Sequence, residues 1–287
     1  MDRVLVSSPA NPRIRAAARL RDRRERDRTG LSLVDGAREV RRALDSGVEV
    51  VEAFVSPGFA ERPDGAAIVE RLEAGGTDWV GATDPALARL AFGDRSEGVV
   101  AVIRPPAIGL ERLMPPAHPL VVVAEGIEKP GNLGAMLRSA DGAGADAVIV
   151  ADPRTDPFNP NAIRASLGTI FSVPLAAASS GDVLGWLAER GIRVLAASAA
   201  AELDYTAADL CGAVALVLGS EADGLSATWQ DDRVTAVRIP MRGVADSLNV
   251  SVAAAVLLYE ARRQRNGRPA ETGDGTAVAE PAQAAPG

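Results

Sequence analysis

The feature that most constrains the fold is an alternation of short apolar runs and helical patterns across residues 120–265. Short runs of mostly apolar residues are typical of buried strands, and they lie at 120–124, 147–150, 194–197, 214–218 and 234–239. Apolar positions with helical spacing lie at 133–144, 161–167, 181–190 and 248–265. Apolar strands that alternate with helices predict an α/β fold whose parallel sheet is covered on both faces.

The first hundred residues predict a smaller α/β unit. A short apolar run at 31–34 ends at the turn signal Asp35-Gly36. The other expected strands are 50–55, 79–80 and 98–103, and the expected helices are 11–28, 37–44, 66–74 and 86–91.

The segments outside these two units are predicted to be irregular. Residues 105–119 are expected to be a linker because they are rich in proline, with a short helix near 110–113. The larger unit then spans 120–266. Residues 267–287 are rich in Ala, Gly, Pro and Thr without periodicity, which predicts a disordered tail.

Composition excludes several classes of function. The single cysteine, Cys211, allows no intramolecular disulfide and no cysteine-based metal site, and the single histidine, His118, lies in the proline-rich linker. We therefore expect no metal. Residues 1–30 are too charged for a signal peptide, and no apolar run is long enough to span a membrane, so we expect a soluble cytoplasmic protein.

The charge is unevenly distributed along the chain. The formal net charge is −7, yet residues 1–30 hold nine arginines against four acidic residues. A basic arm of this kind often contacts phosphates. A solvated helix with internal Arg–Asp and Arg–Glu pairs explains the pattern equally well.

Three segments with unusual residues follow predicted strands of the larger unit. Ligands bind beyond the carboxyl ends of strands in open parallel sheets. The first segment, 125–134, has glycine and proline in its loop. Asn132 is expected to cap the following helix, and Arg138 lies nearly two turns inside it. The loop lacks the G-x-G-x-x-G pattern of a dinucleotide site.

The other two segments are 216–225 and 239–251. The first combines a buried strand with glycines and carboxylates, and glycine lets a ligand approach the backbone closely. In the second, Asp246 or Ser247 is expected to cap the last helix. Asn249 and Ser251 stand just inside an apolar helix start, where buried polar groups need partners.

Together these segments resemble the motifs of the SpoU–TrmH branch of the SPOUT methyltransferases. The resemblance covers roughly 118–265 and preserves both the order and the spacing of the motifs. The first motif corresponds to 132–144, the second to 218–225 and the third to 239–241 with 247–251, and residues 161–168 resemble a segment between the first two. Residues 11–15 and 33–40 are similar to a small ribosomal-protein-like RNA-binding domain found in many members.

The resemblance implies a fold and partners that the pattern alone does not. It implies a trefoil knot in the catalytic domain, a homodimer with each active site near the subunit interface, and S-adenosylmethionine as the cofactor. Residues 1–104 would bind the RNA substrate. The layout is similar to members that methylate a ribose 2'-hydroxyl of rRNA, so 23S rRNA is the expected partner.

The resemblance also implies roles for individual residues. The catalytic positions would be Asn132, Arg138, Glu221, Ser247 and Asn249. Backbone groups near Leu218, Gly219, Ser220, Ile239, Met241 and Leu248 would bind the cofactor. Contacts with RNA would come from Arg13, Arg15, Arg38, Arg164 and Ser166. Arginine is nearly always protonated, so Arg138 is a poor general base; phosphate-assisted proton transfer and simple electrostatic orientation both remain open.

Other functions are compatible with parts of the pattern. Within the same class, the chain could methylate tRNA, and failure to bind S-adenosylmethionine would favour a non-enzymatic RNA-binding protein that kept the fold. A nucleotide-dependent oxidoreductase is disfavoured because the phosphate-binding glycines are missing. Neither the modified nucleotide nor a choice between a housekeeping and a resistance role follows from the sequence.

Overall fold

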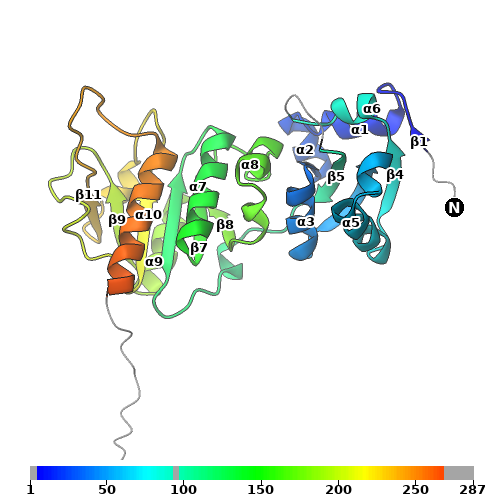
Figure 1. Cartoon of the computed structure of the whole chain (residues 1–287). Coiled ribbons are helices and arrows are strands. Elements are labelled where there is room, and N and C mark those ends of the chain that lie inside the picture. Colours follow the sequence, from blue (N-terminus) through cyan, green and yellow to red (C-terminus); the bar gives the residue numbers. More distant parts are fainter. Residues whose placement is uncertain (1–4, 93–96, 268–287) are drawn as a thin grey trace, which may run out of the picture.

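The computed structural model describes residues 5–92 and 97–267, whose strands form two sheets (Figure 1). The first sheet has the strand order β1-β4-β3-β5-β2, and the second has the order β11-β9-β10-β6-β7-β8. The predicted tail lies almost entirely outside the described residues. No helix within the described ranges is long and apolar enough to cross a membrane.

The first sheet is mixed. β1 and β3 flank β4 in parallel, whereas β5 runs antiparallel to both β3 and β2. Its elements are β1 (Leu5–Val6), α1 (Pro12–Arg19), α2 (Arg23–Thr29), β2 (Ser32–Asp35), α3 (Ala37–Asp45), β3 (Glu49–Val55), α4 (Pro57–Ala60), α5 (Pro63–Ala74), β4 (Asp78–Ala82), α6 (Asp84–Ala88) and β5 (Val99–Arg104). The single helix predicted over 11–28 is wrong. Asp22 interrupts it because its side chain accepts a hydrogen bond from the Arg24 N–H and caps a second helix.

The second sheet is parallel throughout, which confirms the predicted α/β class. Its elements are β6 (Leu120–Glu125), α7 (Pro130–Ala143), β7 (Ala147–Ala151), α8 (Pro160–Ala165), η2 (Thr169–Phe171), β8 (Leu175–Ala178), α9 (Ser180–Glu189), β9 (Arg193–Ala197), β10 (Val214–Leu218), η3 (Ala227–Gln230), β11 (Val234–Val237) and α10 (Val250–Gly267). Alternate residues of β6 and β10 enter two separate buried clusters. One cluster contains α7 and α10, and the other contains α9, so helices cover both faces.

Two predicted helix caps are wrong. In both cases a polar residue of the candidate site lies at a different position relative to the start of its helix. α7 begins at Pro130, which needs no N–H partner at that position, so Asn132 lies inside the first turn. α10 begins at Val250. Asn249 caps it by accepting a hydrogen bond from the Ser251 N–H at 3.0 Å, in place of the predicted Asp246 or Ser247. Asn249 is also exposed rather than buried.

The predicted linker packs against the second sheet. Its short helix is η1 (Leu110–Arg112), a 3-10 turn. The Ala177 N–H of β8 donates to the Ile108 carbonyl at 2.6 Å, and Leu113 is buried. One buried cluster contains residues of both sheets, including Val34 of β2 and Val122 of β6. The division into domains at 104 and 119 therefore stays a prediction.

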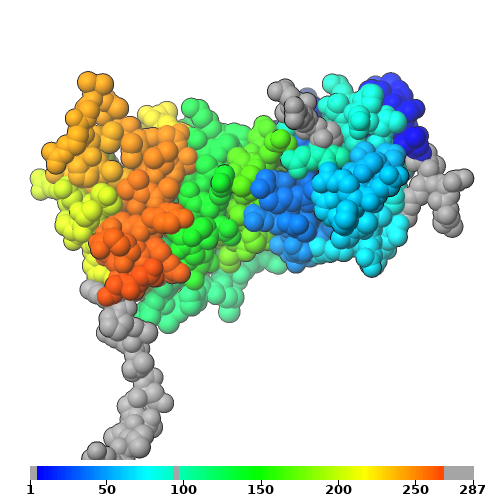
Figure 2. All heavy atoms as spheres, in the orientation of Figure 1, coloured from blue at the N-terminus to red at the C-terminus, as the bar shows by residue number. Residues whose placement is uncertain are grey.

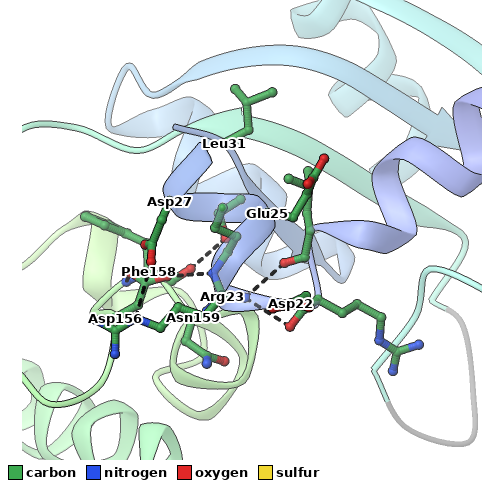
Figure 3. Close-up of polar contacts among 12 residues, drawn as sticks. Asp22, Arg23, Glu25, Asp27, Leu31, Asp156, Phe158 and Asn159 are labelled. Carbon is green, nitrogen blue, oxygen red and sulfur yellow. Dashed lines mark hydrogen bonds and ion pairs between the residues drawn. The ribbon is translucent and has the colours of Figure 1, made fainter. Parts of the chain in front are cut away.

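Polar contacts join the two sheets where α2 and β2 meet the segment before α8 (Figure 3). The Arg26 side chain is only 3% exposed and forms an ion pair with Asp156 at 2.6 Å. The Ser32 hydroxyl donates to the Phe158 carbonyl at 2.6 Å. Breaking a buried ion pair leaves an uncompensated charge, so these contacts hold the two units in one orientation.

A second group of contacts lies farther along the same interface. The Asp35 carboxylate accepts a hydrogen bond from Arg164 at 2.8 Å, and Arg42 donates to the Leu167 carbonyl at 2.8 Å. Burial raises the pKa of Asp35, and the Phe92 N–H and Arg164 act against that rise. Figure 2 shows the surface near residue 165 meeting the surface near residue 40.

The close approach of α7 and α8 predicts a stability effect at Gly134. A Cβ atom there would lie 2.5 Å from the Ala162 carbonyl oxygen and 2.6 Å from the Ala165 Cβ. We expect Gly134→Ala to lower the free energy of unfolding by about 1–3 kcal/mol, because the helices must separate. Urea denaturation measures this change. Gly131→Ala in the same helix is the matched control, since a Cβ there meets nothing within 4 Å; equal effects of the two substitutions would contradict the prediction.

Candidate functional site

A cavity of about 820 Å³ lies at the carboxyl ends of β9, β10 and β11. The segments that follow these strands form its walls, together with the start of α10. This is the edge at which open parallel sheets bind ligands. All six residues predicted to bind the cofactor line the cavity: Leu218, Gly219, Ser220, Ile239, Met241 and Leu248.

The loop after β10 requires glycine at its first position. A Cβ atom on Gly219 would lie 2.2 Å from the Gly224 carbonyl oxygen, well inside contact distance. Ser220 and Gly224 exchange two backbone hydrogen bonds of 3.1 Å, so the loop folds back on itself. Gly224 adopts φ 69°, which glycine tolerates without strain. The loop is therefore a small closed turn that exposes backbone to the cavity edge.

Glu125 binds the chain directly after this loop, and it is not among the site residues predicted from the sequence. It ends the apolar strand β6 and is buried. Its carboxylate accepts hydrogen bonds from the Ser180 hydroxyl at 2.6 Å, and from the Ser226 hydroxyl and N–H at 2.6 and 2.9 Å. Burial opposes ionisation, but these hydrogen bonds outweigh it and lower the pKa of Glu125 below its ordinary value. A lone carboxylate at the end of an apolar strand was the available sequence signal.

A chain of hydrogen bonds joins the three segments identified in the sequence. The Asn132 amide of α7 donates to Glu221 in the loop after β10. The Asn249 amide donates to the Asn132 carbonyl oxygen at 3.3 Å, and Asn249 in turn accepts from the Ser251 hydroxyl at 2.7 Å. Glu221 also lines the cavity, as does Ser247. Four of the five predicted catalytic residues thus lie at or next to one cavity.

Arg138 is the fifth predicted catalytic residue, and it differs from the others. It is exposed on α7 and is not part of the cavity wall. Among the described residues it has no ion pair or hydrogen-bond partner for its guanidinium. A free, permanently charged guanidinium can bind phosphate or carboxylate groups of a ligand.

The predicted RNA-binding residues divide into three groups. Ser166 is completely buried and donates its hydroxyl to the Ile163 carbonyl at 2.7 Å, so its predicted contact with RNA is wrong. Three arginines bind carboxylates of this chain: Arg13 pairs with Glu52 and Asp78, Arg38 with Glu39 and Arg164 with Asp35. Arg15 is exposed and forms no ion pair within the described part of the chain.

The solvated-helix interpretation of the basic N-terminal segment is confirmed for part of it, and the contact with phosphates stays a prediction. Arg23 pairs with Asp27, and Arg28 pairs with Glu25, as a solvated helix would allow. The Arg24 side chain, in contrast, has no partner among the residues described. In the described ranges, no group of three His, Cys, Asp or Glu side chains has the arrangement of a metal site.

Comparison with known proteins matches both parts of the chain. The sequence model of the SpoU rRNA Methylase family matches residues 119–259, and that of the MRM3-like substrate binding domain matches residues 11–101. The 23S rRNA (guanosine-2'-O-)-methyltransferase RlmB of Ralstonia nicotianae is 38% identical over 208 residues, which cover 71% of this chain and 84% of that protein. The 23S rRNA (uridine(2479)-2'-O)-methyltransferase of Streptomyces viridochromogenes is 34% identical and covers 89% and 91%, respectively.

A solved structure shows the same similarity in three dimensions. The SpoU methyltransferase AviRb from Streptomyces viridochromogenes, crystallised with the cofactor AdoMet, superimposes with a TM-score of 0.81. Its sequence is 30% identical, and the match covers 90% of this chain and 99% of that one. The family resemblance found in the sequence is therefore confirmed.

The hydrogen bonds to Glu125 predict a pH-dependent contribution to stability. The pKa of the folded state lies below the ordinary 4.5, so the contribution is fully present above pH 4.5 and is lost as the pH falls through the folded pKa. At pH 7, Glu125→Gln should lower the free energy of unfolding by about 1–3 kcal/mol. Urea denaturation between pH 7 and pH 3 should show this difference shrinking as the wild-type carboxylate becomes protonated.

The control for this prediction is Glu189→Gln, whose side chain is 77% exposed. It should leave the free energy of unfolding nearly unchanged at both pH values. A difference between wild type and Glu125→Gln that stays constant down to pH 3 would mean that Glu125 is not ionised in the folded protein.

Proposed function

The chain belongs to the SpoU rRNA methylase family, and from this membership we propose that it transfers a methyl group from S-adenosylmethionine to a ribose 2'-hydroxyl of 23S rRNA. The observation that carries the proposal is the convergence of Asn132, Glu221 and Asn249, one from each motif, beside a single cavity. The names of the rRNA-modifying relatives support the choice of substrate.

The cavity fits a cofactor with apolar and polar parts. Leu218, Ile239 and Leu248 offer apolar contacts, whereas the closed turn that begins at Gly219 offers backbone groups at close approach. The volume lies within the range of small-molecule sites. When bound, S-adenosylmethionine supplies a methyl group that is already activated by its sulfonium. We propose that these residues, together with Ser220 and Met241, hold it.

The residues around the cavity would position the ribose. Arg138 is always charged and has no partner in the described part of the chain, so we propose that it binds the phosphate next to the target ribose. Asn132 and Glu221 are joined by a hydrogen bond, which would hold the loop after β10 beside the cavity. Ser247 and Asn249 would contact the ribose. Orientation by a fixed cation, rather than proton abstraction by arginine, is the role that this arrangement supports.

We assign RNA capture to the N-terminal unit. Arg15 is exposed and unpaired in the described ranges, which makes it available for a backbone phosphate. Arg13, Arg38 and Arg164 would contribute less, since each is held by a carboxylate of the chain. We also propose a cytoplasmic location, as expected for an enzyme that acts on rRNA.

We propose a homodimer that forms through α10. Val252, Ala255, Val256 and Tyr259 recur at helical spacing on one face, and Val252 and Tyr259 are 48% and 55% exposed. Exposed apolar faces of this kind mark interaction sites. α7, which carries Arg138, packs beside α10 (Figure 1), so the active site would lie near the interface. The trefoil knot of the family is proposed for the same region.

Methylation mapping tests the function. The protein should add one ribose methyl group to 23S rRNA in the presence of S-adenosylmethionine, as detected by mass spectrometry of nuclease fragments. Arg138→Ala should reduce the rate by about 100-fold or more while cofactor binding, measured by calorimetry, stays largely intact. Near-normal transfer by Arg138→Ala would show that the role of Arg138 is wrong. Methylation of tRNA alone would reassign the substrate.

The dimer has a separate test. Val252→Glu combined with Tyr259→Glu should convert the protein to a monomer in light scattering after gel filtration, because two charges would be buried at the interface. Met114→Glu is the control, since Met114 is 89% exposed and lies outside α10. A wild-type monomer, or a dimer that both variants retain, would contradict an interface on this face.

A further inference from the structure

Arg154 contacts two of the loops that surround the cavity. It follows β7, and its guanidinium forms ion pairs with Glu128 at 2.7 Å and with Asp223 at 2.8 Å. Glu128 lies in the loop before α7, and Asp223 lies in the closed turn after β10 and lines the cavity. The strands β10, β6 and β7 are neighbours in the sheet. The loops that follow them at the carboxyl edge therefore meet at one side chain.

The same guanidinium also approaches the backbone where β6 ends. A Cβ atom on Gly126 would lie 3.7 Å from the Arg154 Nε, and Gly126 adopts φ 60°. The side chain is 49% exposed. Exposed ion pairs contribute little to overall stability, so its effect should appear in the position of the loops and not in the stability of the fold.

The backbone of Arg154 is held by the N-terminal unit. Arg23 of α2 donates a hydrogen bond to the Arg154 carbonyl at 2.8 Å. Two residues farther along the chain, Asp156 forms an ion pair with the buried Arg26 of α2. Figure 3 shows α2 lying against this segment. The unit assigned to RNA capture thus contacts the chain directly at the residue whose side chain reaches the cavity loops.

We propose that Arg154 is a positioning residue for cofactor binding. Arg23 of α2 holds its backbone, and its side chain acts through Glu128 and Asp223. This inference rests on the proposed function, because it assigns the cavity to S-adenosylmethionine. Its two ion pairs hold the closed turn after β10 against the loop before α7. The contact with Arg23 links the geometry of the cofactor site to the docking of the N-terminal unit.

The first experiment compares variants of Arg154 by calorimetry with S-adenosylmethionine and no RNA. Arg154→Gln should raise the dissociation constant about fivefold, since two ion pairs are lost. Arg154→Lys keeps the charge and should stay within about twofold of wild type. Arg190→Gln is the control, since it removes the exposed arginine that follows α9 in the same unit. All four proteins should share the wild-type melting temperature within the error of the measurement.

Steady-state kinetics separate positioning from catalysis. Arg154→Gln should raise the KM for S-adenosylmethionine and leave kcat at saturating cofactor within about twofold of wild type. Combining it with Glu128→Gln should add no further loss, because both substitutions break the same contact. An additive loss, or equal affinities of Arg154→Gln and Arg190→Gln, would overturn the proposal.

The link to the N-terminal unit is tested with two adjacent arginines. Arg23→Ala should weaken cofactor binding about twofold, since it removes a hydrogen bond to the Arg154 backbone. Arg24→Ala is the matched control, because its side chain has no partner among the described residues. Equal affinities of these two variants would overturn the link. If wild type itself fails to bind S-adenosylmethionine, the proposed function is wrong; if only the variants are indistinguishable from wild type, the inference about Arg154 alone is wrong.

Discussion

The candidate site depends on the parallel pairing of β6, β10, β9 and β11. Parallel strands all end at the same edge, so loops that are far apart in the sequence must meet there. Asn132 and Asn249 are separated by 117 positions, yet they share a hydrogen bond. Glu125 strengthens this edge by binding Ser180 and Ser226 with one buried carboxylate. An antiparallel sheet would have placed successive loops at opposite ends.

The contact between the two units has a cost as well as a benefit. Arg26 and Asp35 are both buried, and removing such charges from water is unfavourable. Burial raises the pKa of Asp35, and one of its carboxylate oxygens has no partner among the described residues. Apolar residues would stabilise the same contact at lower cost. The charged pairs instead have directional requirements, which favour one orientation of the N-terminal unit over others of similar area.

The sequence predicted those features that depend on local patterns. β6, β7, β9 and β10 are apolar runs and were located to within one residue at each end. β8 was missed because three of its four residues are alanine, which has little preference for strands. The motif residues around the cavity were found through the family resemblance, because their order along the chain is diagnostic. Arg154 and the burial of Ser166 depend on contacts between distant segments, which no local pattern encodes.

The acidic balance of the chain can be reconciled with an RNA substrate. The net charge of −7 gives no long-range attraction for a polyanion. Much of the basic N-terminal segment is also neutralised within the chain, since Arg13, Arg23, Arg26 and Arg28 all pair with carboxylates. These are four of the eight arginines in the described part of the segment, so about half remain for phosphates, and each phosphate contact contributes to the salt dependence of binding. If the N-terminal unit captures the RNA as proposed, recognition would depend on the positions of the remaining arginines, and the orientation of the two units would help to set those positions.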